Sequence, residues 1–285
     1  MTRLFRVIGI GLRKAIFRNI FLYLPLIIYS ICIIYPLFVM FLSSFKHTRE
    51  IFNDPLGLPR IINLDNYRVI FTKVSFLLYF KNSILVTSIS TFLTVTVGTL
   101  AAYALARYRF LGNRFLYFFF LSGLMMPLPL ASLPLFILIK NLGLLNTHAA
   151  LILIYGGWRT SFTILIMSGF FSSLPVGLEE AARVDGCNEF GVFFRVMLPL
   201  AKPGLVIAFI YNSVPIWNDF FIPLIFLRSD NLSTIPLGIS RFFGEYSTNL
   251  GALFSSLSLA MFPILLSYFL MSRKFVESMT SGAFK

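Results

Sequence analysis

Long apolar blocks separated by short polar stretches dominate the hydropathy pattern of this chain. Six blocks are long enough to cross a bilayer, because a membrane helix needs about 20 mostly apolar residues. These blocks cover residues 20–42, 80–105, 115–139, 149–171, 204–227 and 250–272. The pattern therefore predicts an all-α polytopic membrane protein with six transmembrane helices, an N-terminal arm (1–19) and a C-terminal tail (273–285).

A charged, helix-forming segment interrupts the apolar pattern between the fourth and fifth blocks, inside the loop 172–203. It reads EEAARVDGCNEFGVFFRVMLPLAKPG from Glu179 onward. Acids in a first helical turn are favoured by the helix dipole, so Glu179 and Glu180, just after Pro175, predict a helix start. Gly186 predicts the end of that helix, because glycine readily adopts the left-handed conformation.

A second, amphipathic helix is predicted immediately afterwards. Val192, Phe193, Val196 and Met197 recur at helical spacing, so one face can pack on the bundle. The alternative is a helix lying on the bilayer surface. Such helices are usually rich in lysine and arginine, whereas the start of this loop carries acids. The pattern favours a loop that presents a surface to another protein.

Composition agrees with a membrane protein and disfavours a soluble one. Hydrophobic residues make up 58% of the 285 residues and charged residues 12%, whereas soluble domains carry about 25% charged residues. The net charge of +13 does not indicate nucleic-acid binding, because the basic residues cluster at the ends of apolar blocks. Two isolated histidines and two separated cysteines form no metal-ligand pattern.

Basic residues near the block ends predict the orientation. The arm, the loops 106–114 and 172–203 and the tail carry fourteen of them. The opposite side carries eight, five of which lie in the loop 43–79. Because lysine and arginine are enriched in cytoplasmic loops, both termini and the loop 172–203 are predicted to face the cytoplasm.

Polar residues inside the apolar blocks are the candidates for a transport pathway. An arginine within a membrane span costs at least ~2.5 kcal/mol, so Arg159 is expected to face protein or a water-filled cavity. Asp219, in the fifth block, is its predicted partner, and Asn212 and Asn218 are predicted to line the same path. Two interpretations stay open: Arg159 pairs with a carboxylate or a carbonyl, or it lines the path and contacts sugar hydroxyls or the carboxylate or phosphate of an acidic substrate.

The third block contains Pro127, Pro129 and Pro134. Membrane helices tolerate proline where neighbouring helices or water satisfy the freed backbone groups. The prolines therefore predict either a simple kink or a kinked helix that lines a cavity.

The loop residues resemble a known motif. Glu180-Ala181-Ala182, Asp185-Gly186 and Leu198-Pro199 are similar to the EAA loop of binding-protein-dependent ABC importer permeases. Leu64-Asp65-Asn66-Tyr67 and Trp217-Asn218-Asp219-Phe220 resemble motifs of the carbohydrate branch, specifically the second permease of maltose-type systems. Cys187, Ser272 and Glu277 depart from the family pattern.

The resemblance implies the type I ABC importer fold, with 172–203 as the coupling loop between spans four and five. It assigns ATPase coupling to Glu180, Ala181, Ala182, Asp185, Gly186, Leu198 and Pro199, with Glu180 facing a basic residue of the ATPase. It also implies these partners: a second homologous permease, two copies of an ATP-binding subunit that hold ATP and Mg, an extracytoplasmic substrate-binding protein, membrane lipid and a sugar-like substrate. The expected location is a bacterial or archaeal cytoplasmic membrane.

No cofactor and no enzymatic activity are expected on this chain itself. It contains no GxxxxGK[ST] phosphate loop, so ATP hydrolysis is expected on a separate chain. The rival prediction is a secondary carrier driven by an ion gradient. Such carriers show inverted repeats and intramembrane carboxylates, whereas the acids here concentrate in the loop. The substrate stays open among neutral oligosaccharides, polyols, glycerol phosphates and uronate oligomers.

Overall fold

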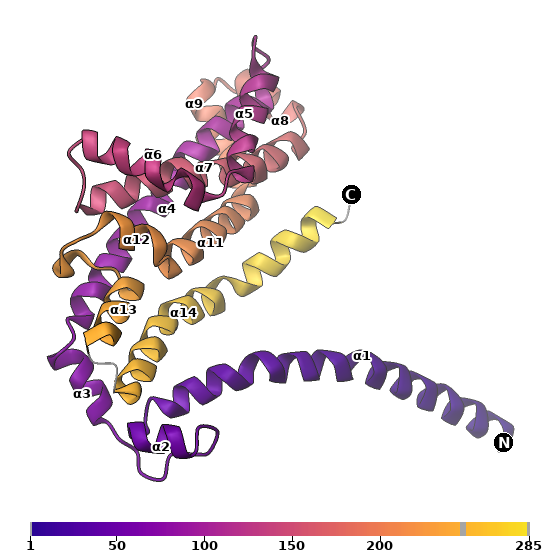
Figure 1. Cartoon of the computed structure of the whole chain (residues 1–285). Coiled ribbons are helices and arrows are strands. Elements are labelled where there is room, and N and C mark those ends of the chain that lie inside the picture. The colour runs from indigo at the N-terminus through magenta and orange to yellow at the C-terminus, as the bar shows by residue number, and fades with distance from the viewer. Residues whose placement is uncertain (1, 246–248, 284–285) are drawn as a thin grey trace. The chain divides into compact units, whose positions relative to one another are not determined.

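The computed structural model describes the backbone of residues 2–245 and 249–283, and the side chains of residues 23–241 and 249–269. The described residues form helices and loops without a strand (Figure 1), which confirms the all-helical prediction. The elements are α1 (Thr2–Ser43), α2 (Thr48–Asn53), α3 (Asp65–Thr72), α4 (Phe76–Arg107), α5 (Asn113–Met125), α6 (Leu128–Asn141), α7 (His148–Ser173), α8 (Gly177–Val184), α9 (Glu189–Gly191), the π-helix η1 (Val192–Met197), α10 (Leu198–Leu200), α11 (Lys202–Asn218), α12 (Phe221–Phe226), the 3-10 helix η2 (Asp230–Leu232), α13 (Ile235–Glu245) and α14 (Leu250–Ala283).

The chain divides into two compact units. Unit 1 comprises residues 1–70 and 246–258, and unit 2 comprises residues 71–245 and 259–285. In unit 1, the buried Lys46 donates its Nζ to the carbonyl oxygen of Asp54 at 2.8 Å. Asn66 donates Nδ2 to the carbonyl oxygens of Ser44 and Lys46, both at 2.9 Å. These bonds hold the segment after α1 in a fixed, folded form.

Unit 2 is built around the pair α4 and α7, which is its most extensive helix contact. The middle of the buried face of α4 consists mostly of small and hydroxyl-bearing residues, which are Ser83, Thr87, Ser90, Thr91, Thr94, Gly98 and Thr99. Such residues let helix backbones approach closely. Close packing matters in a membrane because the hydrophobic effect does not drive helices together in lipid. At Gly98 the approach leaves no room for a side chain, because an added Cβ would lie 2.6 Å from Cβ of Thr163.

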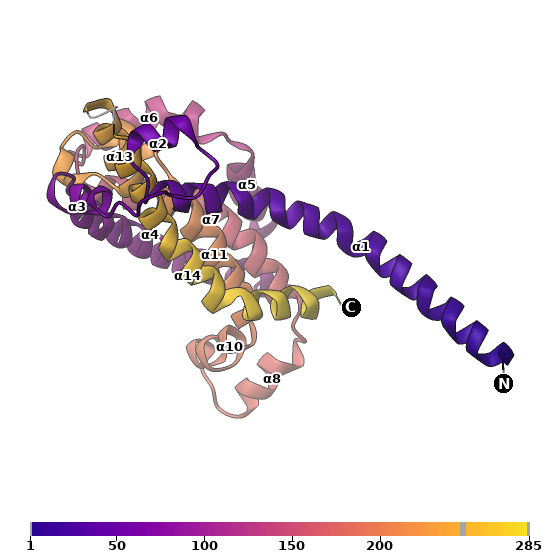
Figure 2. The ribbon, with the colours of Figure 1, turned by 90° about the horizontal axis from the view of Figure 1, so that it is seen from below.

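The described residues of unit 2 form two apolar cores. The first joins α4, α6, α7, α11, α12 and α13 around the buried residues Leu151, Tyr155 and Phe226. The second joins the C-terminal parts of α4 and α7 to α8 and η1 around Tyr103, Phe171 and Met197. Figure 2 shows α8 and α10 together, away from α13. The second core thus anchors the loop 172–203 to one end of the unit.

Among the described residues, four helices are long and apolar enough to span a membrane: Tyr23–Ser43 within α1, α4, α7 and Leu250–Phe269 within α14. They match four of the six predicted blocks. Two further candidates are bent pairs, α5 with α6 at 105° and Glu189–Leu200 with α11 at 75°. The described residues therefore contain four to six candidate spans, and a helix break interrupts each of the predicted blocks 115–139 and 204–227.

The two breaks have identifiable causes. Met126 precedes Pro127, and both residues are extended, with ψ of 113° and 123°. The residue before a proline is pushed out of the helical region, so α5 ends there. In the fifth block α11 ends at Asn218, and Asp219 is extended with a ψ of 126°. Its Oδ1 accepts the backbone N–H of Phe221 at 2.8 Å, which starts α12.

Candidate functional site

The helix α8 ends in a Schellman motif. Gly186 has a φ of 85°, and its N–H donates to the carbonyl oxygen of Arg183 at 3.0 Å. The N–H of Cys187 donates to the carbonyl oxygen of Ala182 at 3.0 Å. These are the two bonds that define the motif, so the prediction that Gly186 ends the helix is confirmed. Cys187 also packs against the second core, which explains how this departure from the family pattern is accommodated.

The second half of the loop docks on the bundle as the sequence predicted. Asn188 caps its start by accepting a backbone N–H at 2.8 Å. Val192, Phe193 and Met197 are buried in the second core, with Val196 half-buried beside them. The helix is a π-helix over these residues. Its i→i+5 bonding widens the turn and brings Val192 and Met197, five residues apart, onto one face.

The predicted coupling residues of α8 do not all share one face. Glu180 and Ala181 are exposed, as is Asp185 just after the helix. Ala182 is 6% exposed and packs into the second core. Of the two alanines, therefore, only Ala181 contributes to the exposed surface. The predicted coupling residues on that surface are two acids, Glu180 and Asp185, and one small residue, Ala181.

The remaining predicted coupling residues lie near the middle of the loop, at Gly186, and toward its end, at Leu198 and Pro199. Gly186 and Pro199 are exposed, whereas Leu198 is half-buried against the second core. Pro199 and Leu198 belong to α10, which Figure 2 shows near α8. The loop therefore brings the two parts of the motif to the same end of unit 2.

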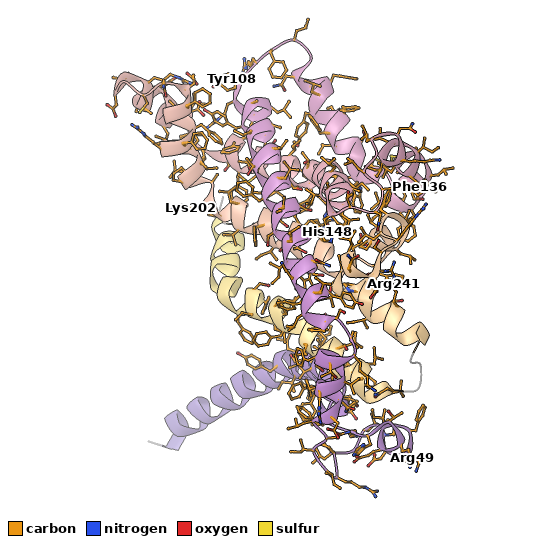
Figure 3. All side chains as sticks on the ribbon, turned by 90° about the vertical axis from the view of Figure 1, so that its left-hand side faces the viewer. Arg49, Tyr108, Phe136, His148, Lys202 and Arg241 are labelled. Atoms are coloured by element: carbon orange, nitrogen blue, oxygen red, sulfur yellow. The ribbon has the colours of Figure 1, made fainter. Side chains whose placement is uncertain are left out.

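A chain of alternating charges fixes α8 to the end of α4. Arg107, the last residue of α4, lies 2.9 Å from Glu179 (Nε to Oε1), and Arg183 lies 3.8 Å from the other oxygen of Glu179. Arg183 also pairs with Glu189 at 2.8 Å. Tyr108 donates its hydroxyl to Glu189 at 2.6 Å. Figure 3 shows Tyr108 at the end of α4. This chain of charges could not be predicted from the sequence, because its members come from three separate elements.

The contacts of Glu189 in this chain of charges shift the pKa of its carboxyl. Its hydrogen bonds from Arg183 and then from Tyr108 lower the pKa of the carboxyl from 4.5 to about 2. The carboxyl hydrogen bond in turn raises the pKa of Tyr108. A carboxylate whose pKa is lowered on folding stabilises the fold above its ordinary pKa, and this contribution is lost as the pH falls through the lowered value.

We therefore expect the backbone amides of α9 to keep their protection against hydrogen exchange between pH 8 and pH 5. The protection should fall as the pH drops from 4.5 toward about 2. Glu189→Gln should remove this pH dependence, because glutamine does not ionise. Hydrogen exchange of the purified protein, corrected for intrinsic rates, measures both. A pH dependence that persists in the variant would assign the effect to another group.

Arg159 lies in α7 beside a second feature, a cavity of about 280 Å³. The cavity is lined by Leu128, Pro129, Tyr155, Trp158, Arg159, Pro215, Ile216, Asp219 and Phe221. It thus lies beside both helix breaks, the start of α6 and the end of α11. Binding sites in membrane transporters often form where spanning helices are discontinuous.

Arg159 and Asp219 share this cavity without forming the predicted ion pair. Arg159 donates an Nη to the carbonyl oxygen of Tyr211 at 2.8 Å, and its guanidinium lies 5.5 Å from the ring centres of Trp158 and Tyr211. Asp219 accepts the hydroxyl of Tyr155 at 2.8 Å. No ion pair within 4.0 Å joins Arg159 to Asp219 among the described residues. The reason is that each side chain has another partner.

The two predicted asparagines do not line this cavity. Asn212 is fully buried and donates Nδ2 to Oγ1 of Thr163 at 2.9 Å, which joins α11 to α7. Asn218 is exposed at the end of α11, outside the lining. Among the described residues, no group of three or more histidine, cysteine, aspartate or glutamate residues has the arrangement of a metal site.

The chain matches a known family over residues 94–281: the binding-protein-dependent transport system inner membrane component. It is 38% identical to the probable ABC transporter permease protein YurM of Bacillus subtilis, over 91% of this chain and 86% of that protein. It is 36% identical to the diacetylchitobiose uptake system permease protein NgcG of Streptomyces coelicolor, with 91% and 87% covered. It is 33% identical to the arabinooligosaccharides transport system permease protein AraQ of Bacillus subtilis, with 90% and 92% covered.

The fold is similar to a solved one. A chain in the crystal structure of a bacterial ABC transporter involved in the import of the acidic polysaccharide alginate superposes with a TM-score of 0.77 and 24% identity. The superposition covers 90% of this chain and 96% of that one. At this identity the likeness shows the fold, which is that of an importer permease.

Proposed function

The chain belongs to the family of binding-protein-dependent transport system inner membrane components, and from that premise we propose that it forms half of the pathway through which an ATP-driven importer moves a sugar or sugar-derived solute. The observation that carries this proposal is its similarity, over about nine tenths of its length, to permeases named for oligosaccharide uptake. As a permease subunit, it leaves ATP hydrolysis to a separate ATPase. The relatives reported above are permeases of ABC or uptake systems and give no support to a gradient-driven carrier.

The proposed assembly contains a second homologous permease, two ATP-binding subunits that hold ATP and Mg, and an extracytoplasmic binding protein. One solved relative of this fold is an alginate ABC transporter in complex with a periplasmic protein bound to an alginate pentasaccharide. The exposed, highly apolar span Tyr23–Ser43, of which 6% is buried, supports contact with lipid or with the second permease.

We propose six crossings, with both termini and the loop 172–203 in the cytoplasm. The excess of basic residues at the arm, at 106–114, at 172–203 and at the tail supports this orientation. The bent pair α5 and α6 would cross once, and in the second bent pair only α11 would cross, because Glu189–Leu200 belongs to the loop. The coupling surface is then the exposed face of α8, with Glu180, Ala181 and Asp185, and the turn at Gly186. Leu198 and Pro199 hold the far end of the loop.

The cavity beside Arg159 and Asp219 is proposed as part of the solute pathway. Its one arginine and one aspartate leave it without net charge, and Trp158 and Tyr155 supply aromatic surface. Arg159 keeps donors beyond its single bond to Tyr211. Such a lining fits the hydroxyl groups and the apolar ring faces of a sugar.

Arg159→Gln is expected to lower solute uptake per assembled complex about tenfold or more, because hydrogen bonds to charged groups contribute ~1.5–3 kcal/mol. Asp219→Asn tests the acceptor on the same wall. Asn218→Ala is the matched control, since Asn218 adjoins Asp219 without lining the cavity. Uptake normalised to the amount of complex is the measurement. Unchanged uptake in both variants would remove the cavity from the pathway.

The experiment that tests the function as a whole is purification of the tagged chain from its native membrane, followed by identification of the co-purifying proteins. An ATPase and a second permease are expected. The complex, placed in proteoliposomes with its binding protein, should take up neutral oligosaccharides when ATP is inside. A chain that purifies alone, or uptake that follows an ion gradient without ATP, would contradict the proposal.

A further inference from the structure

Arg107 and Glu179 differ from every other ion pair among the described residues, because both side chains are buried, with 7% and 6% exposed. The pairs of Arg183 and Arg241 are each at least partly in solvent. Removing one partner of a buried pair leaves a charge without compensation inside the protein. The pair therefore constrains its surroundings more strongly than a surface pair does.

Arg107 joins three elements at one point. It ends α4, it lies 2.9 Å from Glu179 in the first turn of α8, and it donates an Nη to the carbonyl oxygen of Leu174 at 2.8 Å. Leu174 is the residue that ends α7. One guanidinium thus holds the ends of the two central helices and the start of α8 together.

The charge chain closes on itself at the end of α4. It runs from Arg107 through Glu179, Arg183 and Glu189 and returns to Tyr108, the next residue of the chain. Two positive and two negative groups alternate within it. A closed, alternating arrangement resists both rotation and sliding of α8 against α4, whereas an apolar contact alone is non-directional.

The helix α8 needs such contacts to keep its orientation. It contains eight residues, and isolated helices shorter than ~12–15 residues are marginal in water. Its two adjacent glutamates differ in exposure: Glu179 faces inward and contacts Arg107, whereas Glu180 is exposed. The inward side is fixed to the bundle and the outward side is free for a partner.

We propose that the buried pair Arg107–Glu179 is the joint through which movement of α8 reaches the spanning helices α4 and α7. The two are positioning residues: they transmit a displacement and do not touch ATP or solute. This inference rests on the function proposed above, in which the ATPase moves α8. Without the pair, the ATPase stays docked on the outer face, and its cycle no longer moves the bundle.

The test measures transmission directly in the complete importer. A single cysteine replaces Phe221, which lines the cavity, and the native Cys32 and Cys187 are changed to serine. The rate of labelling by N-ethylmaleimide is then compared with and without ATP and vanadate. ATP hydrolysis and ATPase co-purification are recorded on the same samples.

In the parent complex, ATP and vanadate should change the labelling rate. Glu179→Gln and Arg107→Gln are expected to reduce that change about tenfold, within the span of ordinary coupling interactions. The ATPase should still co-purify and hydrolyse ATP. The swap Arg107→Glu with Glu179→Arg should restore part of the change. Arg195→Gln is the matched control, because it removes an exposed arginine from the same loop.

Two outcomes would overturn the inference. In the first, the single variants respond to ATP as the parent does. In the second, they release the ATPase, which would place the pair in docking or folding. Arg107→Lys is the control for misfolding, because it keeps the positive charge and loses the bond to Leu174. Its labelling rate should change more with ATP and vanadate than that of Arg107→Gln. A parent complex without any ATPase would instead contradict the proposed function and leave no joint to test.

Discussion

Glu180→Arg is expected to abolish solute uptake and to release the ATPase from the purified complex. Glu180 lies in the first turn of α8 and is exposed, so its replacement leaves the permease core unchanged. In the function proposed above, Glu180 faces a basic residue of the ATPase. Losing one partner of a charge pair enclosed in an interface costs ~2–5 kcal/mol, and bringing like charges together adds to this. Because each 1.4 kcal/mol is tenfold, the affinity should fall at least ~30-fold.

The measurement is the amount of ATPase that co-purifies with the tagged permease, together with uptake in proteoliposomes. Asp65→Arg is the matched control: Asp65 is also an exposed acid in the first turn of a helix, α3, in the first predicted outer loop. It should leave docking unchanged. Glu180→Gln should give an intermediate loss. Retention of the ATPase by Glu180→Arg would show that docking uses another surface.

Gly98→Val should strongly destabilise the folded permease. An added Cβ at Gly98 would lie 2.6 Å from Cβ and 2.7 Å from Cγ2 of Thr163, and 3.4 Å from the carbonyl oxygen of Thr160. Thr163 is fully buried and cannot turn away, so α4 must move off α7. Overpacking in a protein interior costs ~1–3 kcal/mol. Valine adds two methyl groups beyond Cβ, so the upper part of that range applies.

The expected result is a lower melting temperature of the detergent-solubilised protein and a smaller monodisperse fraction in gel filtration. Gly169→Val is the control. It makes the same substitution in α7, where an added Cβ meets nothing within 4 Å. Equal melting temperatures for the two variants would show that α4 and α7 do not depend on close approach at Gly98.

The loop was predictable from sequence because its signals are local. The acids of the first turn, the glycine at the helix end and the spacing of Val192, Phe193 and Met197 each act within a few residues. The structure reproduces them as α8, a Schellman motif and a buried face. The spacing could not predict that Glu179 faces inward while Glu180 is exposed. Only the position of Arg107, far away in the sequence, decides which glutamate turns inward.

The broken helices and the cavity were harder to predict for a different reason. Hydropathy counts apolar residues, and 115–139 stays apolar through the break at Pro127. Prolines in membrane helices produce anything from a small kink to a full break, so the 105° bend depends on the packing of α6. Likewise, pairing Arg159 with Asp219 followed from charge alone. The structure gives each a neutral partner, the carbonyl oxygen of Tyr211 and the hydroxyl of Tyr155.

The π-helix Val192–Met197 restricts how the length of this chain can change during evolution. Loops ordinarily accept insertions and deletions. Here the wide turn accommodates its number of residues only by i→i+5 bonding. If the same residues closed as an α-helix, everything after them would turn by about 100°, Met197 would leave the second core, and α11 would enter the bundle on the wrong face. Deleting one residue within Val192–Met197 would let the turn close as an α-helix with the following register kept, whereas a deletion elsewhere in the loop would not. The tolerance of this loop to a one-residue change in length is therefore tied to this one turn.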